Sequence, residues 1–277
     1  RTHDIVKNAI SVKLSSLELP NRFFNLFQSR GNTSFELNRT TNTADRRKVE
    51  VDLGPSGGAY FNNVTIVSEI EQKLNFKFPT PEGAVDANNN QLKQFKCSRS
   101  ALGQIIIESI YPVDNPDAFE FWFPKSVVTP QVYPTLPQAI GFTEVSIDTE
   151  EIRQPAYSGT IIEAEDAIDM NMDTYIYLQI NDWNTVTPQV TNDTYFTVFA
   201  KIPVTVDKGK LIYDSDVTNT TTKTYHFLQP TNVQQMEIRL TDRLGQTLQM
   251  PENINYSMTL EVEDVASKAL YEKLREM

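Results

Sequence analysis

The sequence predicts an all-β protein built as an antiparallel β-sandwich, and three observations lead to this prediction. Apolar and polar residues alternate in short runs along most of the 277-residue chain, as they do where one face of a strand is buried and the other is wet. Turn-forming residues separate roughly ten or more such runs at the spacing of a β-sandwich. Neither a strand–helix rhythm nor a repeat of roughly 20–50 residues is present.

The first strand is expected to contain a bulge. From Ile10 to Leu14 the apolar residues occupy even positions, whereas Leu17 and Leu19 continue the alternation at odd positions. One extra residue at Ser15-Ser16 accounts for the change of phase, because a β-bulge bends a strand without ending it. Pro20-Asn21 is then expected to end the strand.

The next segment combines aromatic residues, short strands and a turn. Residues 23–27 contain three phenylalanines, which we expect to pack over one end of the core, and short strands are expected around residues 35–37 and 49–53. Gly54 to Gly58 is the densest turn signal in the chain. A phosphate-binding loop would need a Gly-Lys-Ser/Thr ending, which this stretch lacks, so a turn is the favoured interpretation.

Residues 63–74 are predicted to form an amphipathic helix that covers one end of the sheets, and Asn62 or Asn63 is a suitable capping residue. Residues 79–90, with three successive asparagines, are predicted to form an exposed loop. The apolar residues that share one face of the predicted helix are Ile66, Val67, Ile70 and Leu74.

The middle of the chain returns to β-structure. Residues 104–110 predict a strand buried on both faces, and residues 119–123 predict an alternating strand after a proline-bounded turn at 111–116. Residues 136–142 predict a short helical turn that ends at Gly141.

An acidic segment, residues 148–173, holds eight carboxylates and is predicted to be a solvated loop. Within it, Asp169, Asn171 and Asp173 match the first three ligand positions of a calcium loop. The match then fails, because Thr174 and Ile180 stand where the glycine and the bidentate glutamate are required. The sequence therefore favours a loop over a calcium site.

The C-terminal part predicts several further strands. We expect strands at residues 175–180, at 196–206 with Pro203 indicating an edge or bulged position, and at 225–228 after a polar loop at 216–222. Residues 232–264 show the clearest alternation in the chain, on both sides of a turn at residues 242–245. We expect this stretch to form a half-buried antiparallel hairpin.

These elements together predict a single domain of the jelly-roll type over residues 1–264, with one or two inserted helices. The last residues, 265–277, carry Ala266, Leu270 and Leu274 at helical spacing. They predict a short C-terminal helical tail that docks on its own domain or on a partner.

The charge of the chain argues against nucleic acid and anionic lipid as partners. The net charge is −11 and the isoelectric point is near 4.8. The one basic cluster, Arg46-Arg47-Lys48 with Arg39 nearby, is interpreted as a solvated loop. No apolar run approaches the roughly 18 residues that a membrane span requires.

No constellation of catalytic residues is apparent, and we predict no catalytic, cofactor-binding or metal-binding residue. The chain has two histidines, His3 in the terminus and His226 in a predicted strand, where a hydrogen-bonded structural role is expected. Its single cysteine, Cys97, excludes an internal disulfide and a thiolate metal site. A nucleophile elbow, Gly-x-Ser-x-Gly, is absent. Two carboxylates distant in sequence can still meet in space, so a hydrolase that uses paired carboxylates remains an alternative.

Aromatic side chains and glycosylation sequons raise the question of carbohydrate. Trp122, Trp183, Tyr175 and Tyr177 would suit stacking on sugars, but packing under loops or at subunit contacts is favoured. A carbohydrate-binding β-sandwich is therefore kept as an alternative. Several sequons are expected by chance in a chain this rich in Asn and Thr. They begin at Asn32, Asn38, Asn63, Asn192, Asn219 and Asn255.

Several segments resemble the jelly-roll minor capsid proteins, or penton-like proteins, of nucleocytoplasmic large DNA viruses of algae and protists. The resemblance runs from about residue 5 to residue 264. It is carried by strand and turn patterns rather than by a signature of chemistry. The segments concerned are residues 10–21 with the following phenylalanines, 136–142, 175–182, 199–203 and 232–263.

The resemblance implies a structural, non-enzymatic role in an icosahedral shell without a cofactor. Such a protein would cement major capsid capsomers or occupy a vertex, and its partners would be the major capsid protein, other minor capsid proteins and further copies of itself. Its place would be the virion, after assembly in the host cytoplasm.

Overall fold

The computed structural model describes residues 5–39, 46–54, 57–85, 90–114, 116–123, 134–143, 157–185, 197–215, 223–252 and 254–275. The chain divides into two compact units. The terminal unit comprises Arg1–Phe23 and Asp173–Met277, and the inserted unit comprises Phe24–Met172. Each unit has its own cluster of buried apolar side chains. The sequence predicted one domain over residues 1–264, and the structure instead distributes these residues over two cores.

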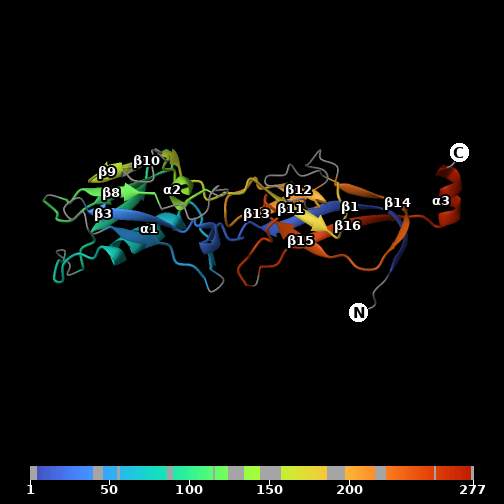
Figure 1. Ribbon diagram of the computed structural model, residues 1–277, viewed down its shortest axis with the longest axis horizontal. Helices are drawn as coiled ribbons and strands as arrows, with labels where there is room; N and C mark the ends of the chain where they lie inside the picture. The colour runs from blue at the N-terminus through green and yellow to red at the C-terminus, as the bar shows by residue number, and fades with distance from the viewer. Residues whose placement is uncertain are drawn as a thin grey trace, which may run out of the picture. The chain divides into compact units, whose positions relative to one another are not determined.

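The first sheet of the terminal unit is built around β1 (Figure 1). Ser16 of β1 is paired with Thr259 on one side and with Ser215 on the other, which places β16 opposite β13. β14 lies on the same side of β1 as β13. It pairs with the N-terminal part of β1, whereas β13 pairs with the C-terminal part. The bounds are β1 Val6–Pro20, β13 Leu211–Ser215, β14 Thr224–Val233 and β16 Ser257–Asp264. The polar loop expected at 216–222 lies outside the described residues.

The bulge predicted in β1 is confirmed. The register between β1 and β16 shifts between Leu14 and Ser16, and Leu14 and Leu17 are both buried on either side of the shift. A second shift, between Ala9 and Ser11, was not apparent in the sequence. Because each shift restores the inward direction of the apolar residues, β1 stays on the core along its 15 residues.

The second sheet of the terminal unit has the order β12-β11-β15. β12 is an edge strand, as Pro203 predicted. The turn predicted at residues 242–245 is confirmed, with an antiparallel bridge between Thr241 and Thr247 across it. The two longer strands of residues 232–264 do not pair with each other as expected, because β15 pairs with β11 in this sheet whereas β16 pairs with β1 in the other. The alternation of side chains was predicted correctly, but alternation does not identify the partner strand. The bounds are β11 Tyr175–Ile180, β12 Ala200–Pro203 and β15 Ile238–Thr241.

The inserted unit contains a sheet of order β4-β3-β8-β9, a sheet of order β10-β7-β6 and the pair β2-β5. The short segment η1, Gln28–Arg30, follows β2. The bounds are β2 Leu26–Phe27, β3 Ser34–Arg39, β4 Arg47–Glu50, β5 Gly58–Ala59, β6 Phe95–Arg99, β7 Gln104–Ser109, β8 Phe119–Trp122, β9 Tyr157–Gly159 and β10 Ile161–Ala167.

Helix α1, Thr65–Lys77, packs on the core of the inserted unit as predicted. Asn62 Oδ1 accepts hydrogen bonds from Val64 N and Thr65 N at 2.9 and 2.8 Å, so Asn62 satisfies N–H groups at the start of the helix. Asn63 is not the cap, because its Oδ1 accepts from Met170 N at 2.9 Å. The buried side chains of α1 are the four that the sequence placed on one face, Ile66, Val67, Ile70 and Leu74.

The described part of the acidic segment is a loop only at its end. Residues 157–167 contain β9 and β10, in which Ile162 and Ala164 are buried between exposed acids, whereas residues 168–173 form neither helix nor strand, as predicted. The acids occupy the outward positions of a strand, which a count of charges does not distinguish from a loop. The short helix α2, Leu136–Ala139, has a capping box between Thr135 and Gln138. α2 ends two residues before the predicted Gly141, and Gly141 itself has a positive φ of +97°. Helix α3, Lys268–Arg275, lies within the predicted C-terminal tail.

Candidate assembly surfaces

The histidine and cysteine residues considered for catalysis lie on separate strands of the described chain, His226 on β14 and Cys97 on β6. His226 is exposed on β14, so the hydrogen-bonded role expected for it is not seen, and His3 lies outside the described residues. Cys97 is buried, and burial together with the negative charge of Glu71 raises the pKa of its thiol. No group of three metal-ligating side chains occurs among the described residues, and no helix there is long and apolar enough to cross a membrane.

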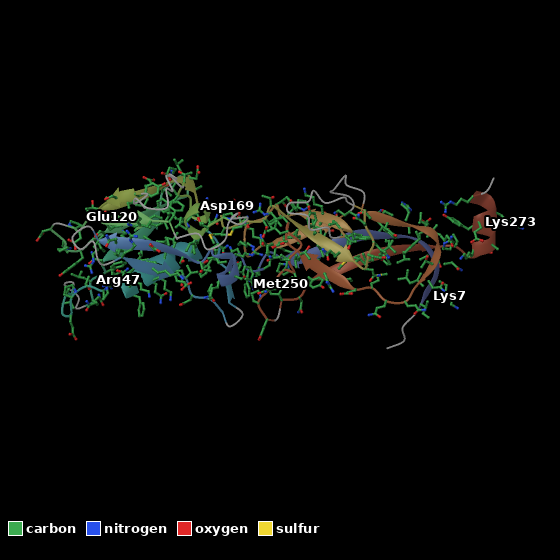
Figure 2. All side chains as sticks on the ribbon, viewed as in Figure 1. Lys7, Arg47, Glu120, Asp169, Met250 and Lys273 are labelled. Atoms are coloured by element: carbon green, nitrogen blue, oxygen red, sulfur yellow. The ribbon has the colours of Figure 1, made fainter. Side chains whose placement is uncertain are left out.

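The segment whose spacing resembles a calcium loop makes hydrogen bonds and ionic contacts within the protein. Asp169 Oδ1 accepts from Asn171 N at 2.8 Å, and Asp169 is exposed (labelled in Figure 2). Asp173 is buried, 3.8 Å from Arg243 Nε. Asp169 and Asp173 therefore differ in both burial and partners, in agreement with the rejection of a calcium loop.

The aromatic residues considered for sugar stacking are packed inside the protein. Trp122, Trp183 and Tyr177 are 5–7% exposed. Trp183 stacks on Tyr225, with ring centroids 5.7 Å apart. Tyr175 is half-buried, and the ammonium of Lys201 lies 3.9 Å from its ring centroid. A lectin-like platform needs exposed aromatic faces, which the two tryptophans do not offer.

The basic cluster is not the solvated loop that was predicted. Arg47 and Lys48 lie on β4, which pairs with β3 in register with Leu37 and Glu36. The guanidinium of Arg46 lies 3.7 Å from the ring centroid of Trp122, and Lys48 Nζ is 2.9 Å from Glu50 Oε1. These charges are engaged by neighbouring side chains, which leaves little free positive potential for nucleic acid.

Two of the sequons cannot be glycosylated in the folded chain, because Asn32 and Asn38 are buried. Asn32 Oδ1 accepts from Phe27 N at 2.8 Å, and Asn38 Nδ2 donates to Glu120 Oε2 at 3.1 Å. Asn255 is exposed, whereas Asn192 and Asn219 lie outside the described residues.

The surfaces that remain of interest are the sheet edges, because a free edge is a template for pairing with another chain. β6 is an edge of its sheet, and α1 covers it. Asn75 Nδ2 donates to Phe95 O at 2.9 Å, and Asn75 Oδ1 accepts from the N–H groups of Gln94 and Phe95 at 2.7 and 3.0 Å. Glu71 Oε2 accepts from Cys97 N at 2.8 Å. Two side chains of α1 thus take the place of a neighbouring strand.

Glu71 is held ionised by the same contacts. Burial by itself raises the pKa of a carboxyl group, but the Lys93 ammonium, 2.5 Å from Glu71 Oε1, and the Cys97 N–H outweigh it and leave the pKa of Glu71 below its ordinary value. On the other side of α1, Glu69 Oε1 accepts from Asp52 N at 2.7 Å. The helix therefore binds the backbone of β6 and of the segment that follows β4 by charged hydrogen bonds.

A second edge of the chain is covered in a different way. Arg275 of α3 donates a hydrogen bond from Nη1 to the carbonyl of Leu228 on β14. Lys273 of the same helix is exposed (Figure 2). The side chain of Leu228 is 81% exposed, so this end of the sheet presents an apolar group beside the basic helix.

The inserted unit also has a hollow of about 380 Å³, lined by both charged and apolar side chains, beside Phe76 of α1, which is 76% exposed. Both acids that line the hollow have a basic partner: Lys73 Nζ lies 2.5 Å from Asp52 Oδ1, and Lys48 Nζ lies 2.9 Å from Glu50 Oε1. An exposed aromatic ring beside paired acids suits an anchoring side chain of a protein partner.

The comparisons with known proteins identify the fold. No family model and no curated protein matches the sequence. Among solved structures, the mavirus penton protein is similar with a TM-score of 0.53 and 12% sequence identity, over 93% of this chain and 86% of that chain. A chain of the Sputnik virophage structure is similar with a TM-score of 0.41 and 12% identity, over 97% of this chain and 93% of that chain. The first similarity shows an antiparallel fold of the jelly-roll type, as predicted.

Proposed function

We propose that the chain is a structural subunit of an icosahedral virus capsid, a penton-like or minor capsid protein that occupies a vertex or cements the major capsid capsomers. The observation that carries the proposal is the extent of the similarity to a penton protein, 93% of this chain and 86% of that one, across both units. The proposal includes a place in the virion, partners among capsid proteins and other copies of the chain, and no catalytic activity.

The surfaces of the described chain support this proposal. Side chains suited to anchoring a protein partner, such as Phe76 and Leu228, are exposed in both units. The buried acids of the terminal unit hold the fold together: Asp214 pairs with Lys223, and Asp242 Oδ1 accepts from Leu244 N and Gln246 N at 2.9 Å. Shell assembly of this kind relies on many weak contacts multiplied by repetition.

The alternatives have less support. A carbohydrate-binding module would need its tryptophans on the surface, and both are buried. A hydrolase that uses paired carboxylates would need an acid whose pKa is raised so that it donates a proton. The pKa values of the Glu71 and Glu165 carboxyl groups are lowered instead, because hydrogen bonds to the ionised form outweigh the effect of burial. The assignment to nucleocytoplasmic large DNA viruses stays a prediction.

Light scattering of the purified chain over a range of protein concentrations tests the proposal. A vertex subunit is expected to form a closed homo-oligomer of fixed size, and a cementing subunit is expected to bind capsomers. A chain that stays monomeric at every concentration, ignores capsomers and binds sugars on a glycan array would contradict the capsid role and favour the lectin-like alternative.

A further inference from the structure

Strand β16 is a long sheet edge whose outer side has no partner in the described part of the chain. Its eight residues, Ser257–Asp264, pair with β1 on one side. Its other side therefore carries a row of backbone N–H and C=O groups that no strand of the described residues pairs with. α1 covers β6, and Arg275 binds a carbonyl of β14, but no described side chain does the same for β16.

The core beneath this edge is only partly covered. Met258, Leu260 and Val262 point toward the core but are half-buried, whereas Val12 and Leu14, their neighbours on β1, are at most 1% exposed. Other half-buried side chains pack against the same core from the second sheet and its connections. They are Met236, Ile238 and Met250, the last labelled in Figure 2. Three of these six side chains are methionine, a side chain that adapts to different contacts.

The opposite face of β16 is acidic. Glu261 and Glu263 are exposed there, opposite Lys13 and Ser11 of β1, and Ser11 Oγ donates to Glu263 Oε2 at 3.1 Å. Asp264 adds a third exposed carboxylate at the end of the strand. Charges on an edge strand discourage pairing with strands that lack the opposite charge.

We propose that β16 accepts an added β-strand from another protein, an extended segment in which apolar residues alternate with Lys or Arg. The backbone row supplies the hydrogen bonds, and the half-buried row takes the apolar side chains of the added strand. Glu261 and Glu263 form cross-strand pairs with its basic side chains. The three features share one strand and one register, so a segment with this alternation satisfies all of them at once.

A second copy of this edge fits less well. Antiparallel self-pairing of β16 would bring Glu261 and Glu263 of one copy next to those of the other, and like charges on adjacent strands are destabilising. A basic partner strand instead lowers the negative charge of this face. The inference rests on the proposed function only for the origin of the strand, which would then be another capsid protein.

Peptide binding to the purified full-length chain tests the inference. The probe is a fluorescein-labelled ten-residue peptide of alternating Val and Lys, compared with alternating Val and Glu and with a Val/Lys peptide of scrambled order. We expect saturable binding of the alternating Val/Lys peptide, at least about tenfold tighter than either control. We also expect slower hydrogen exchange of the backbone amides within residues 257–264.

A charge reversal makes the test specific to this edge. The double variant Glu261→Lys/Glu263→Lys is expected to reverse the preference toward the Val/Glu peptide. The matched control Glu163→Lys/Asp166→Lys changes the same number of exposed charges in the inserted unit and is expected to keep the wild-type preference. If the reversal lowers the thermal midpoint, Glu261→Gln/Glu263→Gln replaces it, with loss of preference expected.

Three outcomes would overturn the inference: equal binding of ordered and scrambled peptides, an equal loss of binding in the control variant, or exchange protection outside β16. Because these measurements use the chain alone, a chain that assembles but ignores the peptides refutes the added strand and leaves the capsid role standing.

Discussion

Asp214 and Lys223 form an ion pair that is almost completely buried, with side chains 5% and 3% exposed. Asp214 is in register with Leu17 of β1, and Lys223 O accepts from Leu14 N at 3.0 Å, so both residues are fixed against β1. They flank residues 216–222, and their contact therefore joins the two ends of that segment. A charge this deeply buried requires its partner, because desolvation of an unpaired ion is costly.

Removing one partner of this pair is expected to lower the free energy of unfolding far more than removing both partners. Asp214→Ala should lower the free energy of unfolding by about 3–5 kcal/mol, because it strands the Lys223 ammonium. The double variant Asp214→Leu/Lys223→Met should recover most of that loss. Urea denaturation measures both values.

The exposed pair Lys210–Asp207 is the matched control. Asp207→Ala should cost less than about 1 kcal/mol, because solvent screens both charges. Equal losses for Asp214→Ala and Asp207→Ala would show that burial does not determine the contribution of the pair.

Gly141 is required by both its backbone conformation and its surroundings. Its φ is +97°, and a Cβ at this position would lie 2.0 Å from Asp166 O, a backbone atom. Gly141→Ala should therefore destabilise the chain by at least about 2 kcal/mol.

Gly31 allows the effect of a positive φ to be measured without a steric clash. Its φ is +67°, but a Cβ added there would meet no atom within 4 Å. Gly31→Ala should cost only about 1 kcal/mol, the contribution of the positive φ. Thermal unfolding of the two variants gives the comparison, and similar midpoints would mean that the Asp166 carbonyl moves aside.

At the level of elements, α1 has features that the sequence predicts and contacts that the sequence does not predict. Its buried face was predicted residue by residue, because helical periodicity depends only on neighbours in sequence. The polar side chains that cap β6 were not predicted, because Asn75 and Phe95 are 20 residues apart and nothing in a periodic pattern records such a contact. The same reason explains why the bulge in β1 was predicted while the partners of β15 and β16 were not.

Because Asn75 covers the edge of β6, truncation of its side chain is expected to lower the free energy of unfolding. Asn75→Ala removes one donor and one acceptor and leaves the N–H groups of Gln94 and Phe95 without this partner. We expect a loss of about 2–3 kcal/mol in unfolding free energy and faster hydrogen exchange at both amides. Asn255→Ala, at an exposed position of the terminal unit, is a suitable control. Unchanged exchange at residues 94 and 95 would refute the capping role.

The packing of α1 on β6 is expected to depend on pH through the carboxyl group of Glu71. Its pKa in the folded chain is lowered from 4.5, so its contribution to stability is present above pH 4.5 and disappears as the pH falls through the folded value. Wild type should therefore lose more stability than Glu71→Gln on acidification. Urea denaturation at pH 7 and below pH 4 measures the difference, and equal losses in the two proteins would contradict the role of the ionised carboxylate.

At the level of the whole molecule, the inserted unit lies between β1 and β11 in sequence, so the terminal unit is assembled from both ends of the chain. Alternation identified many of the strand-forming and core-facing residues of both units, but it missed β6, β9, β10 and β13 and gave no sign of the boundary at Phe23 and Phe24. Periodicity reports which residues are buried and not which core buries them. Candidate contact surfaces were equally hidden, since the exposure of Phe76 and Leu228 depends on neighbours distant in sequence.

Whether the chain is a capsid subunit is decided by light scattering of the purified chain mixed with capsomers from disrupted virions. We expect a stable complex with the capsomers, or a closed homo-oligomer that joins them. We also expect that deletion of residues 265–277, which removes α3 and its contact with Leu228, weakens the association. A monodisperse monomer whose mass does not change when capsomers are added would contradict the capsid role.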